Sequence, residues 1–354
     1  MRAELRSLHL IASPQMGRAE TSFLRHTHAL NSSGHPVCCG VRSGAKLATQ
    51  IGAGMSCTSF AMRNYLDLGS VLDIRRWISE QDAPIVQTWA SRATWLTRPP
   101  PRFLHLARLG GHYKPRHFRH AHGWIVNTEG MRRWMIGAGF PAKRVQQISN
   151  FVPEQTPCEG TQPTRLDLHI PEHALLVVSL GRFFEKKGFQ DLISAFSNLP
   201  VEIGGRPLHL LLIGDGPMRQ QLQRQAQQNA ARIHFSGWLD QPLNALQLAD
   251  LFVCPSRIEP MGNVILEAWS RGLPVVCTQT DGGLELIAHG QNGLLCPVQD
   301  PASLSQTLHR LLGEPDLRQS LALSGKQHYQ SHYSEQKTIE SLTDFYQRML
   351  RDLR

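Results

Sequence analysis

Short apolar segments alternate with stretches of helical periodicity along the whole chain. In the first half, the segments predicted to be strands lie at residues 8–12, 36–42, 84–89, 102–107, 124–128 and 145–149. Helices are expected between them, notably at 19–32 and at 68–80, where Leu68, Val71, Leu72 and Ile78 share one face. This alternation is typical of a parallel sheet covered by helices.

The alternation is interrupted between residues 153 and 171. This segment contains four prolines, one glycine and few large apolar residues, a composition that favours neither helix nor strand. Beyond it, strands are expected at 175–180, 208–213, 233–236, 251–254 and 274–278, and helices at 189–199, 218–230, 243–249, 263–270, 302–312, 316–328 and 335–351. We therefore predict two open α/β sheets joined by a linker, which suits a length of 354 residues.

Charge is divided unevenly between the two halves. Residues 1–150 carry 20 Lys and Arg against 7 Asp and Glu, whereas residues 151–354 carry 17 against 21. A strongly basic half attracts phosphates, anionic lipid surfaces or nucleic acid. A general bias of the protein towards solubility would give the same excess and remains an alternative.

The chain contains no apolar run near the roughly 20 residues that a membrane helix requires. The apolar stretch at 8–12 is also too short for the core of a signal peptide. The seven cysteines include no Cys-x-x-Cys pair, and three of them lie in strand-like segments, as expected for reduced thiols. We expect a cytoplasmic protein, including a peripheral position on the cytoplasmic face of a membrane.

Turns that follow strands are the candidate sites, because open α/β sheets bind ligands at the carboxyl ends of their strands. Gly17 is expected to form a tight turn before a helix whose N-terminus favours an anion. An ordinary strand-to-helix turn without a ligand is the alternative. Arg182 and Lys187 lie in a later turn. Their two positive charges could bind a diphosphate, or they could belong to a solvated basic loop. Gly214 and Gly216 let a base or phosphate approach the backbone, but the third glycine of a dinucleotide motif is missing.

The segment 255–268 carries the most specific pattern. Glu259 lies in the loop after a predicted strand, and a helix is expected to begin near Gly262. The first amides of this helix, from Met261 to Val264, would then form a phosphate site. Glu267 is placed to accept hydrogen bonds from ribose hydroxyls, and Glu259 from a sugar ring. Two solvated glutamates at a helix end are the alternative. A glycine loop at 279–285 is expected to add a wall to the pocket.

Together these segments resemble the retaining glycosyltransferases of the GT4 family, which have the GT-B fold. The resemblance is carried by Gly181-Arg182-Phe183, Lys187-Gly188, Gly214-Asp215-Gly216-Pro217, Glu259-Pro260-Met261-Gly262-Asn263 and Glu267-Ala268, which include the family's pattern of two glutamates eight positions apart. It is strong over residues 175–300 and weak over the N-terminal half. The fold that it implies is α/β, with two facing Rossmann-like domains, parallel sheets and a cleft between them.

The resemblance also implies that one domain binds the acceptor and the other binds the donor. The acceptor domain would comprise residues 1–155 together with a terminal helix at 335–354 that crosses back to it, and the donor domain residues 165–334. Arg182, Lys187 and Glu259 are then the catalytic candidates. The implied donor-binding residues are Gly17, Gly181, Gly214, Gly216, Met261, Gly262, Asn263, Val264 and Glu267.

Gly17 resembles the first glycine of the family's Gly-Gly-x-Glu turn, and Arg18 stands where the second glycine is usual. This change either removes a phosphate contact or directs the loop to a more anionic acceptor. Residues 108–114, with Asn127-Thr128, resemble bacterial members that build surface polysaccharide or lipopolysaccharide core. His105, Arg108 and Lys114 are the acceptor-binding candidates. Residues 98–133 hold eight Lys and Arg and one acid, which suits anionic lipid headgroups or phosphorylated glycans.

The expected reaction moves a sugar from a nucleotide-diphosphate sugar to a glycan or glycolipid. The chain has no Asp-x-Asp motif, and paired cations can stabilise the leaving diphosphate, so we expect no metal and no cofactor. Retention of anomeric configuration is implied by the resemblance, through same-face attack assisted by the departing phosphate.

Several other functions are alternatives to this one. A sugar-nucleotide epimerase or phosphorylase would share the architecture, and a non-catalytic subunit of an envelope-assembly complex would not need the charged residues. Glycoside hydrolysis is disfavoured because the glutamates lie among cations suited to phosphate. Zinc held by His112, His117, His120 and His122 lacks support from Cys or Asp. Nucleic acid is not an expected partner, because aromatic residues do not alternate with the basic ones.

Overall fold

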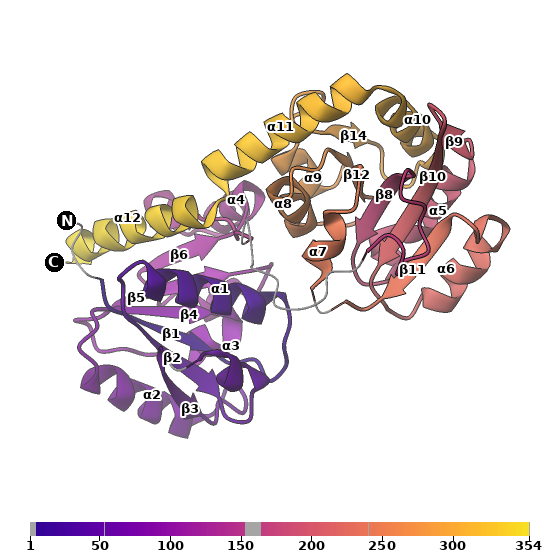
Figure 1. Ribbon diagram of the computed structural model, residues 1–354. Coiled ribbons are helices and arrows are strands. Elements are labelled where there is room, and N and C mark those ends of the chain that lie inside the picture. The colour runs from indigo at the N-terminus through magenta and orange to yellow at the C-terminus, as the bar shows by residue number, and fades with distance from the viewer. Residues whose placement is uncertain (1–4, 53, 153–163, 240, 354) are drawn as a thin grey trace. The chain divides into compact units, whose positions relative to one another are not determined.

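The computed structural model describes residues 5–52, 54–152, 164–239 and 241–353 and divides the chain into two units. Unit 1 comprises Met1–Phe151 and Glu335–Arg354, and unit 2 comprises Val152–Ser334. Each unit is a parallel sheet with helices packed against it (Figure 1). Of the predicted linker at 153–171, residues 153–163 lie outside the described residues.

Unit 1 contains a parallel sheet in the order β3-β2-β1-β4-β5-β6-β7. Its strands are β1 (Ser7–Ile11), β2 (Val37–Arg42), β3 (Ser56–Phe60), β4 (Ile85–Trp89), β5 (Leu104–Leu109), β6 (Gly123–Val126) and β7 (Val145–Gln147). The six predicted strands are present, and the edge strand β3 was missed because its sequence, Ser-Cys-Thr-Ser-Phe, is mostly polar and exposed.

The helices of unit 1 cover both faces of this sheet. They are α1 (Arg18–Ser32), α2 (Leu68–Glu80), α3 (Ala90–Leu96), α4 (Glu129–Gly137) and α12 (Glu335–Leu353), with short 3-10 helices η1 (Lys46–Gln50), η2 (Pro115–His117) and η3 (Ala142–Arg144). One hydrophobic cluster joins α1 and α12 to the sheet, and another joins α2 and α3 to the opposite face.

The buried face of α2 agrees with the predicted one at Val71 and Ile78 but not at Leu68 and Leu72. Leu68 and Leu72 are 75% and 68% exposed, whereas Ile74, Trp77 and Ile78 are buried. The reason is the missed strand β3, since the Trp77 ring packs edge-on against Phe60 at a centroid distance of 5.4 Å. The unpredicted partner therefore determined which side of the helix faces the core.

Unit 2 contains the second sheet, in the order β11-β10-β8-β12-β13-β14, with a short β9 paired antiparallel to β10. Its strands are β8 (Leu175–Leu180), β9 (Glu202–Ile203), β10 (Arg206–Ile213), β11 (Ile233–Gly237), β12 (Leu251–Cys254), β13 (Val275–Thr278) and β14 (Leu294–Cys296). The strands β8 and β12 have the predicted bounds, while β14 was not expected.

The helices of unit 2 pack on both faces of its sheet. They are α5 (Phe189–Ser197), α6 (Arg219–Ala226), α7 (Pro242–Leu246), α8 (Asn263–Ser270), α9 (Asp281–Leu286), α10 (Pro301–Gly313) and α11 (Pro315–His332), with η4 (Glu185–Lys187) and η5 (Gln227–Asn229). Helix α9 occupies the segment that was predicted as a glycine loop, because Thr280 caps it by accepting a hydrogen bond from the Gly283 amide at 3.3 Å.

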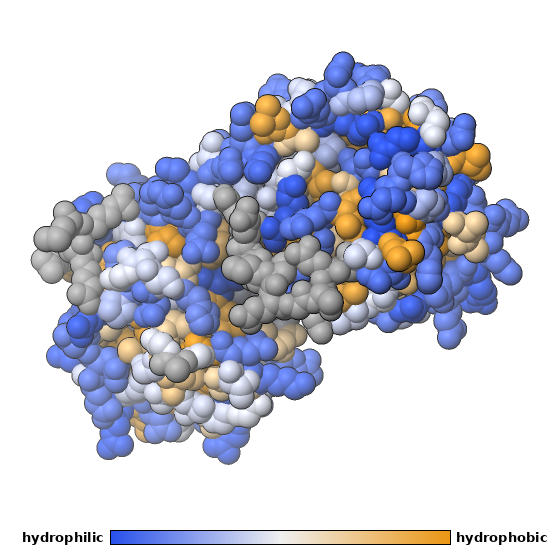
Figure 2. Space-filling view, in the orientation of Figure 1, coloured by the Kyte–Doolittle hydropathy of each residue, from blue (hydrophilic) through white to orange (hydrophobic). Residues whose placement is uncertain are grey.

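The large apolar side chains are concentrated in clusters on the faces of the two sheets. On the face of the molecule that Figure 2 shows, hydrophilic residues predominate and hydrophobic ones form small patches. No helix of the described residues combines the length and the hydrophobicity needed to cross a membrane.

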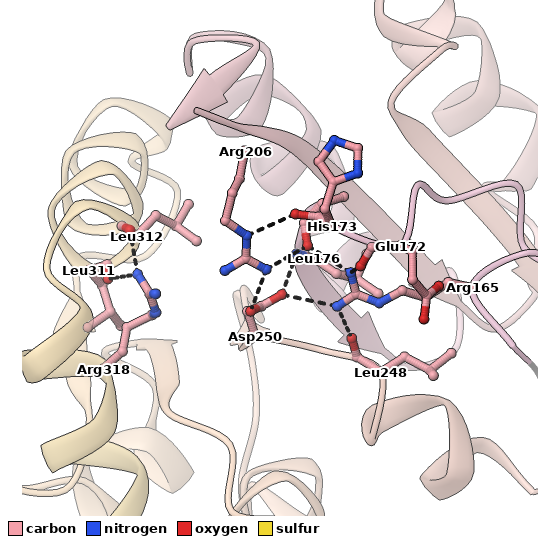
Figure 3. A network of polar contacts seen from close by, with 11 residues as sticks. Arg165, Glu172, His173, Leu176, Arg206, Leu248, Asp250, Leu311, Leu312 and Arg318 are labelled. Atoms are coloured by element: carbon pink, nitrogen blue, oxygen red, sulfur yellow. Dashed lines mark hydrogen bonds and ion pairs between the residues drawn. The ribbon is translucent and has the colours of Figure 1, made fainter. Parts of the chain in front are cut away.

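A network of charged residues fastens the amino ends of the strands in unit 2 (Figure 3). The Asp250 carboxylate accepts hydrogen bonds from Arg165 at 3.3 Å, from Arg206 at 3.2 Å and from the Leu176 amide at 2.9 Å. Arg165 and Arg206 also donate to backbone carbonyls of neighbouring segments. The charged groups at the amino ends of these strands are therefore satisfied by contacts within the protein.

Candidate functional site

The loops that carry the predicted site follow β8 and β12, which are neighbours in the sheet of unit 2. From β8 the chain moves to β10 and β11 on one side, and it then returns to β12 on the other. The boundary between β8 and β12 is thus the point where the strand order reverses. Open α/β sheets bind ligands outside the carboxyl ends of their strands at such a point.

Lys187 and Glu259 meet at this position. Lys187 ends η4, Glu259 lies in the loop after β12, and the ammonium donates to the Glu259 carboxylate. Both residues are buried, at 8% and 2% exposure. A buried ion pair is sensitive to loss of one partner, because the other charge then remains desolvated and uncompensated.

The Lys187 ammonium has capacity for more than this contact. An ammonium has three N–H donors, and within the described part of the chain the only hydrogen-bond partner of Lys187 is Glu259. Burial withdraws the remaining donors from bulk water. Oxygen atoms of an anion would satisfy them.

Gly188 allows Lys187 to lie here. Its backbone is left-handed, with φ of 67°, and a Cβ atom at this position would be 1.9 Å from the carbonyl oxygen of Pro255. A side chain therefore cannot be accommodated without moving the end of β12. The close approach of the two loops depends on glycine at this residue.

Helix α8 begins beside Glu259, as the sequence predicted. Gly262 precedes the helix in a left-handed conformation, with φ of 66°, and supplies no side-chain cap. The first amides of the helix therefore carry partial positive charge without a capping side chain. Met261 and Asn263 are half-buried and Val264 is buried, and the buried Oδ1 atom of Asn263 accepts no hydrogen bond from any described residue.

Arg182 and Glu267 have different environments from the central pair. Arg182 is exposed, and its guanidinium lies 4.6 Å from the centroid of the Phe184 ring. Among the described residues no hydrogen bond or ion pair joins it to Lys187 or Glu259. Glu267 is half-buried on α8. The structure thus joins one of the two predicted phosphate-binding cations directly to the first glutamate.

The close packing of two loops requires glycine at position 214. Its φ is 137°, and a Cβ atom there would lie 2.0 Å from the carbonyl oxygen of Gly181. The loops after β8 and β10 also share a hydrogen bond from the Phe183 amide to the Asp215 carbonyl, at 2.9 Å. Glycine at 214 therefore allows the two loops to pack closely. Gly181 supplies the carbonyl that Gly214 approaches, and Gly216 packs against the backbone of Phe183 in the same loop.

Two of the three acceptor candidates lie inside unit 1, which corrects their assignment. His105 is fully buried, where its ring contacts Thr88 at 3.0 Å, and burial lowers its pKa. Arg108 is 2% exposed and donates to the Ile148 carbonyl at 3.0 Å, and burial lowers its pKa to about 9. Their position on the central strand β5 explains this, and only Lys114 is exposed.

The loops after β1 and β4 hold the remaining features of unit 1. These strands are neighbours where the strand order of the first sheet reverses. Gly17 is exposed and directly precedes α1. Ala90, directly after β4, has a φ of 61°, a strained conformation for a residue with a Cβ atom. No pattern in the sequence marks Ala90, because its strain arises from the tertiary structure.

Two of the four histidines considered for zinc, His120 and His122, make hydrogen bonds within unit 1. His122 accepts from the His105 amide at 2.9 Å, and His120 contacts the carbonyls of Thr94 and Thr97 at 2.9 and 3.2 Å. Within the described ranges no three His, Cys, Asp or Glu side chains are grouped so that they could hold a metal ion.

Comparisons with known proteins identify the family of the chain. The sequence model of the family described as Glycosyl transferases group 1 matches residues 162–328. The lipopolysaccharide core biosynthesis glycosyltransferase LpsE of Rhizobium meliloti (strain 1021) is 30% identical over 345 residues, which cover 94% of this chain and 96% of LpsE.

Solved structures of similar fold cover both units. HepE of Anabaena, in complex with UDP and glucose, has a TM-score of 0.77 and 19% identity, covering 98% of this chain and 100% of HepE. A glycosyltransferase from Rickettsia africae ESF-5 has a TM-score of 0.82 and 15% identity, covering 99% of each chain. At these identities the structures bear on the fold alone, and they confirm the prediction of two Rossmann-like domains with parallel sheets and the GT-B fold.

Proposed function

Because this chain belongs to the glycosyl transferases group 1, the GT4-type glycosyltransferases, we propose that it moves a sugar from a nucleotide-diphosphate sugar to a glycan or glycolipid of the lipopolysaccharide core, with retention of anomeric configuration. The observation that carries the proposal is the buried Lys187–Glu259 pair at the strand reversal of unit 2. LpsE is named for lipopolysaccharide core biosynthesis and HepE is in complex with UDP and glucose, which supports this choice of acceptor and donor.

The donor diphosphate is proposed to lie between Lys187 and the first amides of α8. A nucleoside diphosphate is a good leaving group whose departure requires stabilisation of negative charge more than a strong acid. The remaining N–H donors of Lys187 and the first amides of α8, which no side chain of the N-cap residue caps, supply this charge stabilisation. Arg182, which is exposed, turns towards the second phosphate when donor binds.

The two glutamates are proposed to orient the other parts of the donor. Glu259 accepts hydrogen bonds from hydroxyls of the transferred sugar, and its bond to Lys187 places that sugar beside the diphosphate. Glu267, one helix turn from the start of α8, accepts from the ribose hydroxyls. Gly181, Gly214 and Gly216 bring the neighbouring loops close enough to complete the donor site.

Transfer is proposed to need no metal and no other cofactor. Lys187 and the helix amides stabilise the departing diphosphate, whose oxygen takes the proton of the attacking acceptor hydroxyl on the same face of the sugar. The new glycosidic bond therefore forms on the side from which the phosphate leaves. Chelation of divalent cations with EDTA is expected to leave the rate unchanged.

The acceptor is proposed to bind unit 1 at the carboxyl ends of β1 and β4. The exposed turn at Gly17 and the strained Ala90 mark this position. Lys114 and the other exposed basic residues of the segment 98–133 (Arg102, Arg116, Arg119 and Arg133) supply positive charge for an anionic acceptor and for peripheral contact with the cytoplasmic face of the inner membrane.

A donor screen tests the proposed function. The purified chain is incubated with UDP-, GDP-, ADP- and dTDP-linked sugars, with and without lipopolysaccharide core oligosaccharide, and the released nucleoside diphosphate is measured. We expect release with one class of donor, a mass increase of one sugar on the oligosaccharide, and an unchanged anomeric configuration by NMR. Conversion of the donor sugar without transfer would instead identify an epimerase, and the absence of binding and turnover with every donor would refute the proposal.

A further inference from the structure

A second ion pair joins the segments that carry Lys187 and Glu259. Arg257, in the loop after β12, donates through Nε and Nη2 to the two carboxylate oxygens of Asp191, each at 2.8 Å. Asp191 lies in the first turn of α5, close after Lys187 in the chain. A third contact joins Arg257 Nη1 to Glu185 at 3.3 Å. The fork geometry with two parallel bonds is one that arginine forms and lysine cannot.

The backbone joins the same two segments. The carbonyl of Lys186 accepts hydrogen bonds from the amides of Arg257 at 2.9 Å and of Ile258 at 3.1 Å. Lys186 precedes Lys187 and Ile258 precedes Glu259, so the two members of the central pair extend from adjoining, hydrogen-bonded backbone. Rotation or separation of either segment would carry its charged side chain away from the other.

The charge of Arg257 is already neutralised by its protein partners. The side chains of Arg257 and Asp191 are 21% and 12% exposed, and their hydrogen bonds raise the pKa of Arg257. A guanidinium that is held by both carboxylate oxygens has little charge left for a donor phosphate. Its effect must therefore pass through the residues that it holds in place.

We propose that Arg257 is a positioning residue of the transferase, whose fork to Asp191 fixes the distance and direction between Lys187 and Glu259. This inference rests on the proposed function, because it assigns the pair the task of binding the donor. Small displacements of groups that position a reacting substrate have large effects on rate, with about 1 Å costing as much as a hundredfold. Arg257 thus sets donor affinity and turnover without contacting the donor.

The same sheet contains a matched control pair at the opposite ends of its strands. Arg165 and Asp250 have side chains that are 12% and 20% exposed and lie 3.3 Å apart, beside the amino ends of the strands. Loss of either arginine removes a similarly buried contact with an aspartate. A purely structural role for Arg257 predicts equal consequences for the two arginines.

The test compares Arg257→Ala, Arg257→Lys and Asp191→Asn with Arg165→Ala. For each protein, thermal unfolding is followed, the affinity for UDP, GDP or ADP is measured by calorimetry, using whichever binds the wild type best, and kcat and KM are determined for the corresponding donor. We expect kcat/KM to fall about tenfold to a hundredfold in Arg257→Ala, with weaker diphosphate binding, and almost as far in Arg257→Lys. Arg165→Ala should keep wild-type kcat and KM below its unfolding temperature.

Rescue sharpens the test. The exchange Arg257→Asp with Asp191→Arg restores the ion pair in reverse, and we expect it to recover part of the loss seen with either single change. Unaltered kcat and KM in folded Arg257→Lys and Asp191→Asn would overturn the positioning role, as would equal losses in Arg165→Ala. Wild-type protein that neither binds nor uses any donor would instead refute the proposed function, and the inference with it.

Discussion

Two networks of charged side chains lie at opposite edges of the sheet in unit 2, and they differ in how completely the protein satisfies them. At the amino ends, the Asp250 carboxylate accepts from Arg165, Arg206 and the Leu176 amide, and the arginines also bond to carbonyls. At the carboxyl ends, the Lys187 ammonium has Glu259 as its single hydrogen-bond partner among the described residues.

The network at the amino ends stabilises the fold, whereas the one at the carboxyl ends is the network that we propose to bind the donor. At the amino ends, Arg165, Arg206 and Asp250 each bond to an opposite charge or to the backbone, so a ligand would have to displace protein contacts. At the carboxyl ends, the first turn of α8 lacks a side-chain cap and the buried Oδ1 of Asn263 has no partner among the described residues. Unsatisfied buried groups are costly, and a bound anion and sugar would satisfy them.

The largest expected effect comes from removing Lys187. Lys187→Ala should lower kcat/KM for the donor by about a thousandfold, because it removes a charge that acts on the leaving diphosphate. Lys186→Ala is the matched control, since Lys186 is exposed and one residue away, and it should stay within about twofold of the wild type. Steady-state kinetics with the donor found in the screen gives the comparison. Equal rates for Lys187→Ala and wild type would remove Lys187 from the site.

A smaller effect, on stability, is expected at the amino ends. Asp250→Ala should lower the free energy of unfolding of unit 2 by about 2 to 3 kcal/mol, because two arginines and a backbone amide lose their shared acceptor. Hydrogen exchange of peptides from unit 2 measures this change. The variant should keep the wild-type KM at a temperature where it remains folded, and an altered KM would show that the two edges are coupled.

The smallest expected effect is a dependence of stability on pH. His209 and His234 lie on β10 and β11 with ring nitrogens 2.9 Å apart, and burial, followed by repulsion from His209, lowers the pKa of His234 to about 4. The unfolded chain binds a proton near pH 6.5, which the folded protein accepts only near pH 4, so stability falls as the pH falls between these values.

Substitution of His234 isolates this contribution. His234→Gln should unfold at a temperature that changes less between pH 7 and pH 4.5 than that of the wild type. Thermal denaturation at a series of pH values measures the difference. The same acid slope in both proteins would assign the pH dependence to other groups.

Much of the fold could be predicted from the sequence because buried parallel strands leave a strong local pattern. The apolar runs of β8 and β12 and the helix α8 have the predicted bounds. Elements with weak patterns were missed, such as the polar edge strand β3 and the helix α9, whose two glycines indicated a loop. The buried face of α2 was predicted only in part, because Trp77 on that face packs against Phe60 of the missed strand.

What the sequence alone determined is which chemical groups stand at the carboxyl ends of the strands, since parallel strands bring successive loops to one edge whatever their side chains do. Only the tertiary structure decided how those groups pair. Sequence spacing does not reveal that Lys187 bonds to Glu259 across 72 residues or that Arg257 forms an ion pair with Asp191. It also does not reveal that Arg108 is buried. Such contacts arise from packing between distant segments, and local sequence carries no record of them.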